Sequence, residues 1–156
     1  MFNNYYIPPE PVVSPRQIYE RSNHCFHFPY YQNSPLFFRH GRTALFYGLK
    51  TCKLTQDVVL VPAYLCGSVL STIKAAGCDI EFYKIRENLE IDFDDLEVKV
   101  QNARVLLVIH YFGFPQPLDK LAKLCQEYET LLIEDCAHAL FSSFGKQILG
   151  TVCQNY

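Results

Sequence analysis

Several features that would assign this chain to a protein class are missing from its 156 residues. No apolar run approaches the length of a membrane-spanning helix, so we expect no contact with a membrane. A formal net charge of −2 offers no cationic surface, so we expect no nucleic-acid partner. The N-terminal stretch MFNNYYIPPE has no basic segment followed by an apolar one, and we therefore expect no signal peptide.

The cysteines lack a pattern as well. No C-x-x-C pair occurs, and the seven cysteines are odd in number and scattered along the chain. A disulfide framework and a structural zinc site both need more regular spacing than this. Most of these thiols lie in apolar periodic segments, where a free cysteine behaves as a small hydrophobic residue. We therefore expect a reducing, cytoplasmic environment.

The residues that are present indicate one α/β domain with an arm. Prolines and aromatic side chains crowd residues 1–40, which predicts an irregular arm lying across the domain or a partner subunit. Over residues 41–156, apolar runs alternate with helical periodicities, which predicts a mostly parallel sheet with flanking helices. The expected strands are 58–61, 80–85 (from the alternation of Ile80, Phe82 and Ile85), 105–109 and 130–135 (buried on both faces). The expected helices are about 41–51, 69–76 (ended by Gly77), 96–100 (capped by Asp92 or Asp94) and 117–128, and the expected hairpin is 141–152.

The stretch that most suggests chemistry is Thr130–Leu140. Its apolar run stops at two carboxylates, Glu134 and Asp135, and His138 follows. Ligands of open α/β sheets bind just outside the carboxyl ends of the strands, where Asp135 would lie. A partly desolvated carboxylate there needs a positive or hydrogen-bonding partner. The alternatives are a helix cap for Asp135 and a satisfied interior histidine for His138, while Glu134 is expected to point away from the site.

A second candidate site is the helix start Gly41-Arg42-Thr43. Free backbone N–H groups and the positive end of the helix dipole favour a phosphate there, and the Thr43 hydroxyl could add a hydrogen bond. An ordinary helix start is the alternative interpretation of so short a motif.

Five segments, taken in order, resemble a known family. They are GRTAL, VVLVPAYLC, AAGCDIEFY, HYFGFP and IEDCAHAL. Together they resemble the first half of the large domain of the DegT/DnrJ/EryC1/StrS sugar aminotransferases, over about residues 36–153. These are pyridoxal 5′-phosphate (PLP) enzymes with the type I aspartate-aminotransferase fold. The resemblance therefore implies a partial type I large domain and PLP as cofactor.

The resemblance also implies roles for single residues. Asp135 would pair with the pyridine nitrogen of PLP and keep it protonated, which makes the ring an electron sink. His138 would lie beside the cofactor. The segment Tyr64–Cys66 matches the one that supplies a ring-stacking residue; relatives often carry an aromatic at the position of Cys66, whereas here the aromatic is Tyr64. Arg42 and Thr43 match the segment that holds the phosphate.

The resemblance implies that the family transfers an amino group, commonly from glutamate, to a nucleotide-linked keto-sugar. It also implies that the active site lies at a homodimer interface. The family's Schiff-base lysine lies beyond the hairpin, and the chain ends at Tyr156 before it. Lys146 lies in a predicted, solvent-facing hairpin turn, so we do not expect it to replace that lysine. We therefore name no catalytic residue and interpret the chain as a fragment, from which we expect no turnover. The alternative is a truncated or degenerate homologue that serves as a non-catalytic binding or dimerisation module.

Two further chemistries can be written for the same residues. Cys136, His138 and His110 could suggest a metal, but the sequence offers no second close pair of ligands, so no metal is expected. Cys136 could act as a nucleophile with His138 as its base. Neighbouring carboxylates, however, should raise the pKa of that thiol rather than lower it. His110 and its neighbour Tyr111 are expected to support their loop.

Overall fold

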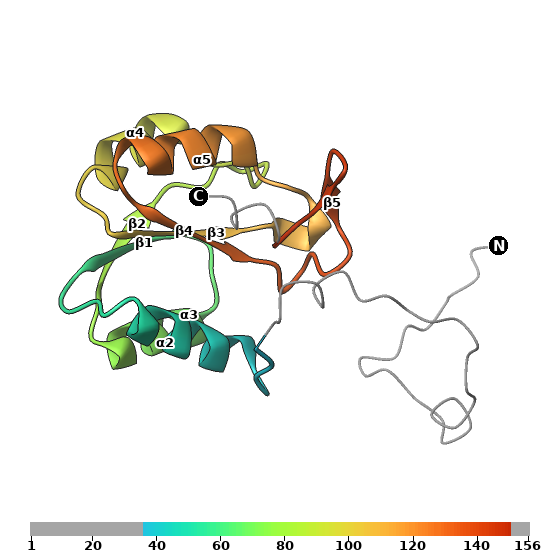
Figure 1. The fold of residues 1–156 in the computed structure, drawn as a ribbon. Helices are drawn as coiled ribbons and strands as arrows, with labels where there is room; N and C mark the ends of the chain where they lie inside the picture. Colours follow the sequence, from blue (N-terminus) through green and yellow to red (C-terminus); the bar gives the residue numbers. More distant parts are fainter. Residues whose placement is uncertain (1–35, 151–156) are drawn as a thin grey trace, which may run out of the picture.

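The computed structural model describes residues 36–150, and the expected arm lies almost wholly outside them. A four-stranded sheet forms the centre of the described part, with its strands in the order β2-β1-β3-β4 and all neighbours parallel (Figure 1). The predicted α/β class with a parallel sheet and flanking helices is confirmed. The strands are β1 (Val58–Pro62), β2 (Asp79–Tyr83), β3 (Val105–Ile109) and β4 (Leu131–Asp135).

Two helices cover each face of this sheet, α2 and α3 on one side and α4 and α5 on the other (Figure 1). A short 3-10 turn follows β3, and a small antiparallel hairpin follows β4 as predicted. No described helix has the length and apolar character needed to cross a bilayer. The elements are α2 (Gly41–Thr51), α3 (Gly67–Ala76), α4 (Phe93–Val100), α5 (Leu118–Glu127), η2 (Tyr111–Gly113), β5 (Ser143–Phe144) and β6 (Gln147–Ile148).

The core lies in two layers because successive side chains of a strand point to opposite faces. In β3, Leu106 and Val108 pack with the α4 and α5 side, whereas Val105 and Leu107 pack with the α2 and α3 side. The central strands β1 and β3 are therefore buried on both faces. This double burial explains why they appear in the sequence as uninterrupted apolar runs.

The edge strands differ from their predictions. β4 was expected to be buried on both faces, but Leu131 is 42% exposed because β4 borders the described sheet. The predicted alternation of Ile80, Phe82 and Ile85 is also wrong in part. Ile85 lies beyond β2, and Phe82 is exposed at the end of that edge strand, so that the buried aromatic is Tyr83.

Helix ends follow the local chemistry of the sequence. Asp92 is the N-cap of α4, and its carboxylate accepts the backbone N–H of Asp95 at 3.4 Å. Gly77 ends α3 with a left-handed backbone, at φ +86°.

We expect Gly77→Ala to lower the free energy of unfolding by about 1 kcal/mol, the cost of a left-handed alanine. A Cβ at this position would contact nothing within 4 Å, so backbone strain is the only cause. Gly48→Ala is the matched control, since Gly48 also has open space around it but lies inside α2. Alanine there should stabilise the chain by up to about 1 kcal/mol. Urea unfolding of both variants checks the opposite signs, and equal shifts would contradict the explanation.

Candidate functional site

A large cavity opens where β1, β3 and β4 end. Parallel pairing brings the carboxyl ends of these strands to one edge of the sheet, and the loops that follow them wall the cavity together with the start of α2. Its volume is about 1050 Å³, the upper end of the range for small-molecule sites. Five of the six predicted site residues line it, whereas Thr43 does not. The five are Arg42, Tyr64, Cys66, Asp135 and His138.

The N-terminus of α2 presents backbone donors at one end of this cavity. The His40 carbonyl accepts the N–H groups of Thr43 at 3.0 Å and Ala44 at 3.2 Å, which leaves the preceding N–H groups without a partner in the helix. Arg42 adds an exposed cation at the same place. The cavity therefore has an anion-binding end, with the positive end of a helix dipole behind it.

Asp135, at the end of β4, also lines this cavity. Ile133 packs with the α2 and α3 side of the core, so strand alternation places Asp135 on that face as well. Its Oδ1 accepts the backbone N–H of Ala137 at 2.9 Å. No helix follows it within residues 136–150, so the helix-cap alternative is wrong.

Two tyrosines, Tyr64 and Tyr111, line the cavity and contact each other. The Tyr111 hydroxyl donates to the Tyr64 carbonyl, and the two rings lie 5.5 Å apart with a 37° tilt. Burial raises the pKa of Tyr111 to about 12, and the charges of Tyr64 and Asp135 act in the same direction. Tyr111 therefore stays protonated, and its hydroxyl holds the loop that carries Tyr64 rather than its own loop.

His138 lies at the rim of the cavity. It is exposed and stacks on Phe112 with ring centroids 5.5 Å apart, which excludes the interior histidine considered above. Phe112 adopts a left-handed backbone at φ 53°, an uncommon conformation for an aromatic residue that is favoured at functional loops.

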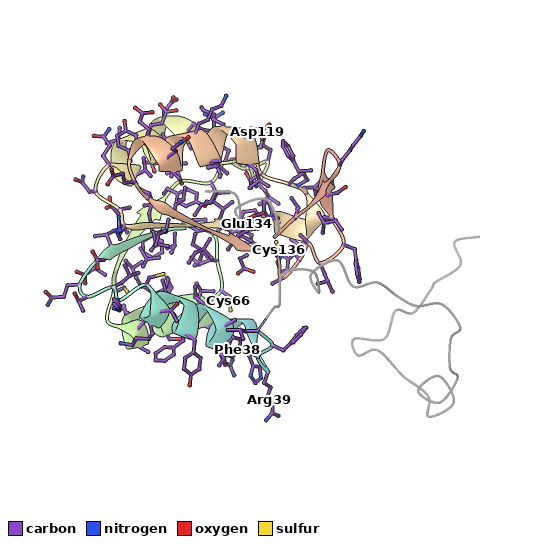
Figure 2. The ribbon with its side chains drawn as sticks, viewed as in Figure 1. Phe38, Arg39, Cys66, Asp119, Glu134 and Cys136 are labelled. Atoms are coloured by element: carbon purple, nitrogen blue, oxygen red, sulfur yellow. The ribbon has the colours of Figure 1, made fainter. Side chains whose placement is uncertain are left out.

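The pKa values of the two cysteines that line the cavity are shifted in opposite directions. Cys66 is the exposed N-cap of α3, and hydrogen bonds from the Ser68 side chain and backbone lower the pKa of its thiol, aided by the charge of Arg42. Burial raises the pKa of Cys136 to about 12, and the carboxylates of Glu134 and Asp135 raise it further. The expected effect of those carboxylates is confirmed, and it opposes a nucleophilic Cys136. In Figure 2, Cys66 lies beside the helices of one face, and Cys136 lies at the end of β4.

This contrast predicts the order of thiol reactivity. We expect iodoacetamide at neutral pH to alkylate Cys66 faster than Cys52, which is also exposed but has no Ser68 neighbour, because the thiolate is the reacting species. Cys136 should stay unmodified until the chain unfolds. Ser68→Ala should slow the Cys66 reaction and leave Cys52 unchanged. Peptide mapping by mass spectrometry gives all three rates, and equal rates at Cys66 and Cys136 would contradict the assignment.

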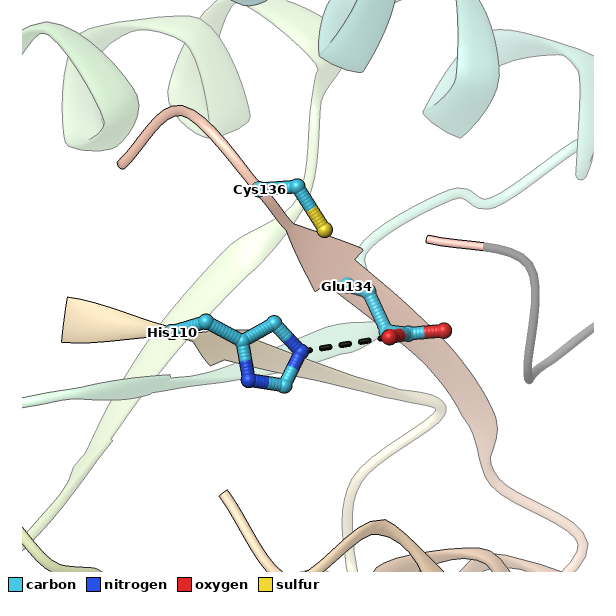
Figure 3. Close-up of side chains that lie close together, drawn as sticks. All are labelled: His110, Glu134 and Cys136. Atoms are coloured by element: carbon cyan, nitrogen blue, oxygen red, sulfur yellow. Dashed lines mark hydrogen bonds and ion pairs between the residues drawn. The ribbon is translucent and has the colours of Figure 1, made fainter. Parts of the chain in front are cut away.

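His110, Glu134 and Cys136 form a cluster beside the cavity, and their possible ligand atoms lie within 4.8 Å of one another (Figure 3). The backbone N–H of Gln116 donates to His110 Nδ1 at 3.0 Å, so the proton of the neutral ring is on Nε2. Nε2 then donates to Glu134 Oε2 at 3.1 Å. A metal would need the lone pair of that same nitrogen, so this hydrogen-bond pattern favours an ion-free network.

Sequence reasoning missed some residues of the cavity. Ser68, which adjusts the Cys66 thiol, follows the strand-end motif by only a few residues and could have been noticed as a hydroxyl in the first turn of a helix. Gly150 could not, because its N–H reaches Glu134 Oε2 at 3.0 Å across a turn and a hairpin that carry no periodic signal.

Known proteins share this fold. A GDP-perosamine synthase of Vibrio cholerae is 29% identical over 114 residues, which cover 71% of this chain and 31% of that protein. The E. coli GDP-4-keto-6-deoxy-D-mannose-3-dehydratase with bound hydrated PLP superposes with a TM-score of 0.65 at 21% identity, over 72% of this chain and 31% of that one. S. venezuelae DesV in complex with a ketimine intermediate superposes with a TM-score of 0.58 at 25% identity, over 64% and 28%.

The chain thus spans about a third of the length of these relatives. The model of the DegT/DnrJ/EryC1/StrS aminotransferase family matches residues 36–154, which include every described helix and strand. The chain belongs to the DegT/DnrJ/EryC1/StrS aminotransferase family.

Proposed function

We propose that this chain binds PLP in the cavity at the strand ends, as part of an aminotransferase that acts on nucleotide-linked keto-sugars. The observation that supports this most is the presence of an anion-binding helix start and a carboxylate in the lining of one cavity. PLP carries an anionic phosphate and a basic ring nitrogen, so it needs both features at once. Structural neighbours contain PLP or an intermediate in their own sites.

Each residue then has a task that its position allows. The first N–H groups of α2, with Arg42, would bind the phosphate, and Asp135 would hold a proton on the ring nitrogen. That proton is what allows PLP, when bound, to withdraw electrons from a substrate. Tyr64 or Cys66 would lie against the ring, and His138 would contact ring substituents at the rim. Thr43 would act through its place in the first turn of α2, since it does not line the cavity.

The test is direct binding of pyridoxamine 5′-phosphate, which lacks the aldehyde that would label surface lysines. Fluorescence titration of the full chain should show saturable binding, and inorganic phosphate should compete. Pyridoxamine without its phosphate should bind much more weakly, because the α2 N–H groups would have no anion. Equal affinities for the two pyridoxamines, or no binding, would overturn the proposal.

For the whole protein we propose transfer of an amino group, commonly from glutamate, to a nucleotide-linked keto-sugar. We propose that it acts as a homodimer in the cytoplasm. All described cysteines are free, in agreement with a reducing environment.

The expectation that this chain alone gives no turnover stays a prediction. Incubation with PLP, glutamate and a keto-sugar nucleotide should form no amino-sugar nucleotide detectable by mass spectrometry, because no lysine is proposed to anchor the cofactor. Multiple turnovers would contradict it.

A second candidate function is a non-catalytic binding or dimerisation module. Phe112 and Phe114, on the loop beside the cavity, are 64% and 73% exposed, which is unusual for paired aromatic residues on an isolated surface. They would be covered in a complex with another copy or with a complete relative. Light scattering of the chain with and without a full-length homologue separates the two cases, and a monomer in both would exclude docking.

A further inference from the structure

We infer that the buried His110–Glu134 pair is a positioning pair that fixes Asp135 in its orientation toward the cavity. Glu134 and Asp135 are neighbours at the end of β4, and strand alternation points them to opposite faces of the sheet. A contact that holds Glu134 on one face therefore also holds Asp135 on the other. The part of this inference that concerns the cofactor rests on the proposed function, whereas the part that concerns Asp135 does not.

The pair is buried and fully engaged by hydrogen bonds. The side chains of His110 and Glu134 are 0% and 3% exposed. Glu134 Oε2 accepts two hydrogen bonds, from His110 Nε2 at 3.1 Å and from the Gly150 N–H at 3.0 Å. A buried carboxylate is stable only when such donors replace its water, so these bonds hold its position strongly.

The network joins four segments that meet around Asp135. His110 follows β3, Glu134 ends β4, Gln116 precedes α5 and Gly150 follows the hairpin. The backbone closes the same corner, because the His110 N–H donates to the Asp135 carbonyl at 3.3 Å. None of the bonds involves the carboxylate of Asp135 itself. The network can therefore set the orientation of that carboxylate without occupying it.

Two variants separate positioning from simple stability. Glu134→Gln keeps the length and one acceptor oxygen, which can receive both N–H groups. Glu134→Leu has a similar volume but no acceptor, so it leaves the buried N–H groups of His110 and Gly150 unpaired. The direct readout is the amide of Ala137 in ¹H–¹⁵N NMR spectra, because this amide donates to Asp135 Oδ1 and reports the orientation of that carboxylate.

We expect Glu134→Leu to shift the Ala137 amide resonance and speed its hydrogen exchange, and Glu134→Gln to keep both near wild type. Glu134→Leu should weaken pyridoxamine 5′-phosphate binding about tenfold, while binding of inorganic phosphate changes by less than about twofold. If Glu134→Leu does not fold, Glu134→Asp replaces it. The shorter side chain keeps the charge, but it can reach the N–H groups of His110 and Gly150 only if the end of β4 moves.

The inference is overturned if the Ala137 amide is unchanged in a folded Glu134→Leu chain, or in a folded Glu134→Asp chain where that variant replaces it. It is also overturned if phosphate and pyridoxamine 5′-phosphate affinities fall together, which is the result expected of a general loss of structure. Failure of the wild-type chain to bind pyridoxamine 5′-phosphate would reject the proposed function, and the amide readout would still decide the positioning role.

Discussion

Asp135→Asn should weaken the binding of pyridoxamine 5′-phosphate by about 10- to 100-fold. The reason is the loss of a charge-assisted hydrogen bond to a protonated ring nitrogen, which contributes about 1.5–3 kcal/mol in a desolvated site. Asparagine has the same shape, and its carbonyl oxygen can still accept the Ala137 N–H, so the loop should keep its conformation. Fluorescence titration of the purified full chain measures the two dissociation constants.

Asp119→Asn is the matched control for this experiment. Asp119 is exposed in the first turn of α5, on the face of the sheet remote from α2 (Figure 2). The same change of charge there should leave affinity within about twofold of wild type. Inorganic phosphate should bind both variants equally, since it contacts only the helix start. An Asp135→Asn chain that binds pyridoxamine 5′-phosphate like the wild type would show that this carboxylate does not meet the ring.

The sequence predicted the elements of the fold well where local chemistry determines them. The apolar run of β3 was placed residue for residue, because double burial removes polar residues from a central strand. Gly77 was predicted as a helix end because it has no side chain, and Asp92 was one of two candidate caps, the other being Asp94. The edge strands were less well predicted, since an edge has one neighbour and its burial depends on what packs beside it.

In the candidate site, too, the sequence predicted the residues that local patterns mark and missed those that depend on tertiary contacts. Asp135 and the start of α2 were found because each stands at the end of a recognisable element. Which face each carboxylate of β4 takes depends on register with β3, and the register is a tertiary property. The exposure of His138 depends in the same way on its contact with Phe112, a residue of another loop. Such contacts join segments that are distant in sequence, so no local sequence pattern predicts them.

Leu106→Ala is expected to lower the free energy of unfolding by about 2.5–5 kcal/mol, a large share of the stability of a domain this size. Leu106 is fully buried in the layer between the sheet and helices α4 and α5. Removal of its side chain leaves a cavity that the neighbouring strands cannot fill. Urea denaturation measures the loss, and Val98→Ala, at a residue 67% exposed on α4, should change stability by less than about 0.5 kcal/mol.

The same substitution tests whether one layer of the core contributes to stability alone and the other also contributes to ligand binding. Leu107, the next residue, points to the other face and lines the cavity, whereas Leu106 does not. Leu106→Ala should therefore leave the affinity of the folded chain for pyridoxamine 5′-phosphate unchanged, while Leu107→Ala should alter both stability and affinity. If Leu106→Ala weakened binding as much as Leu107→Ala under conditions where both remain folded, the site would depend on the whole sheet rather than on the face that carries Asp135.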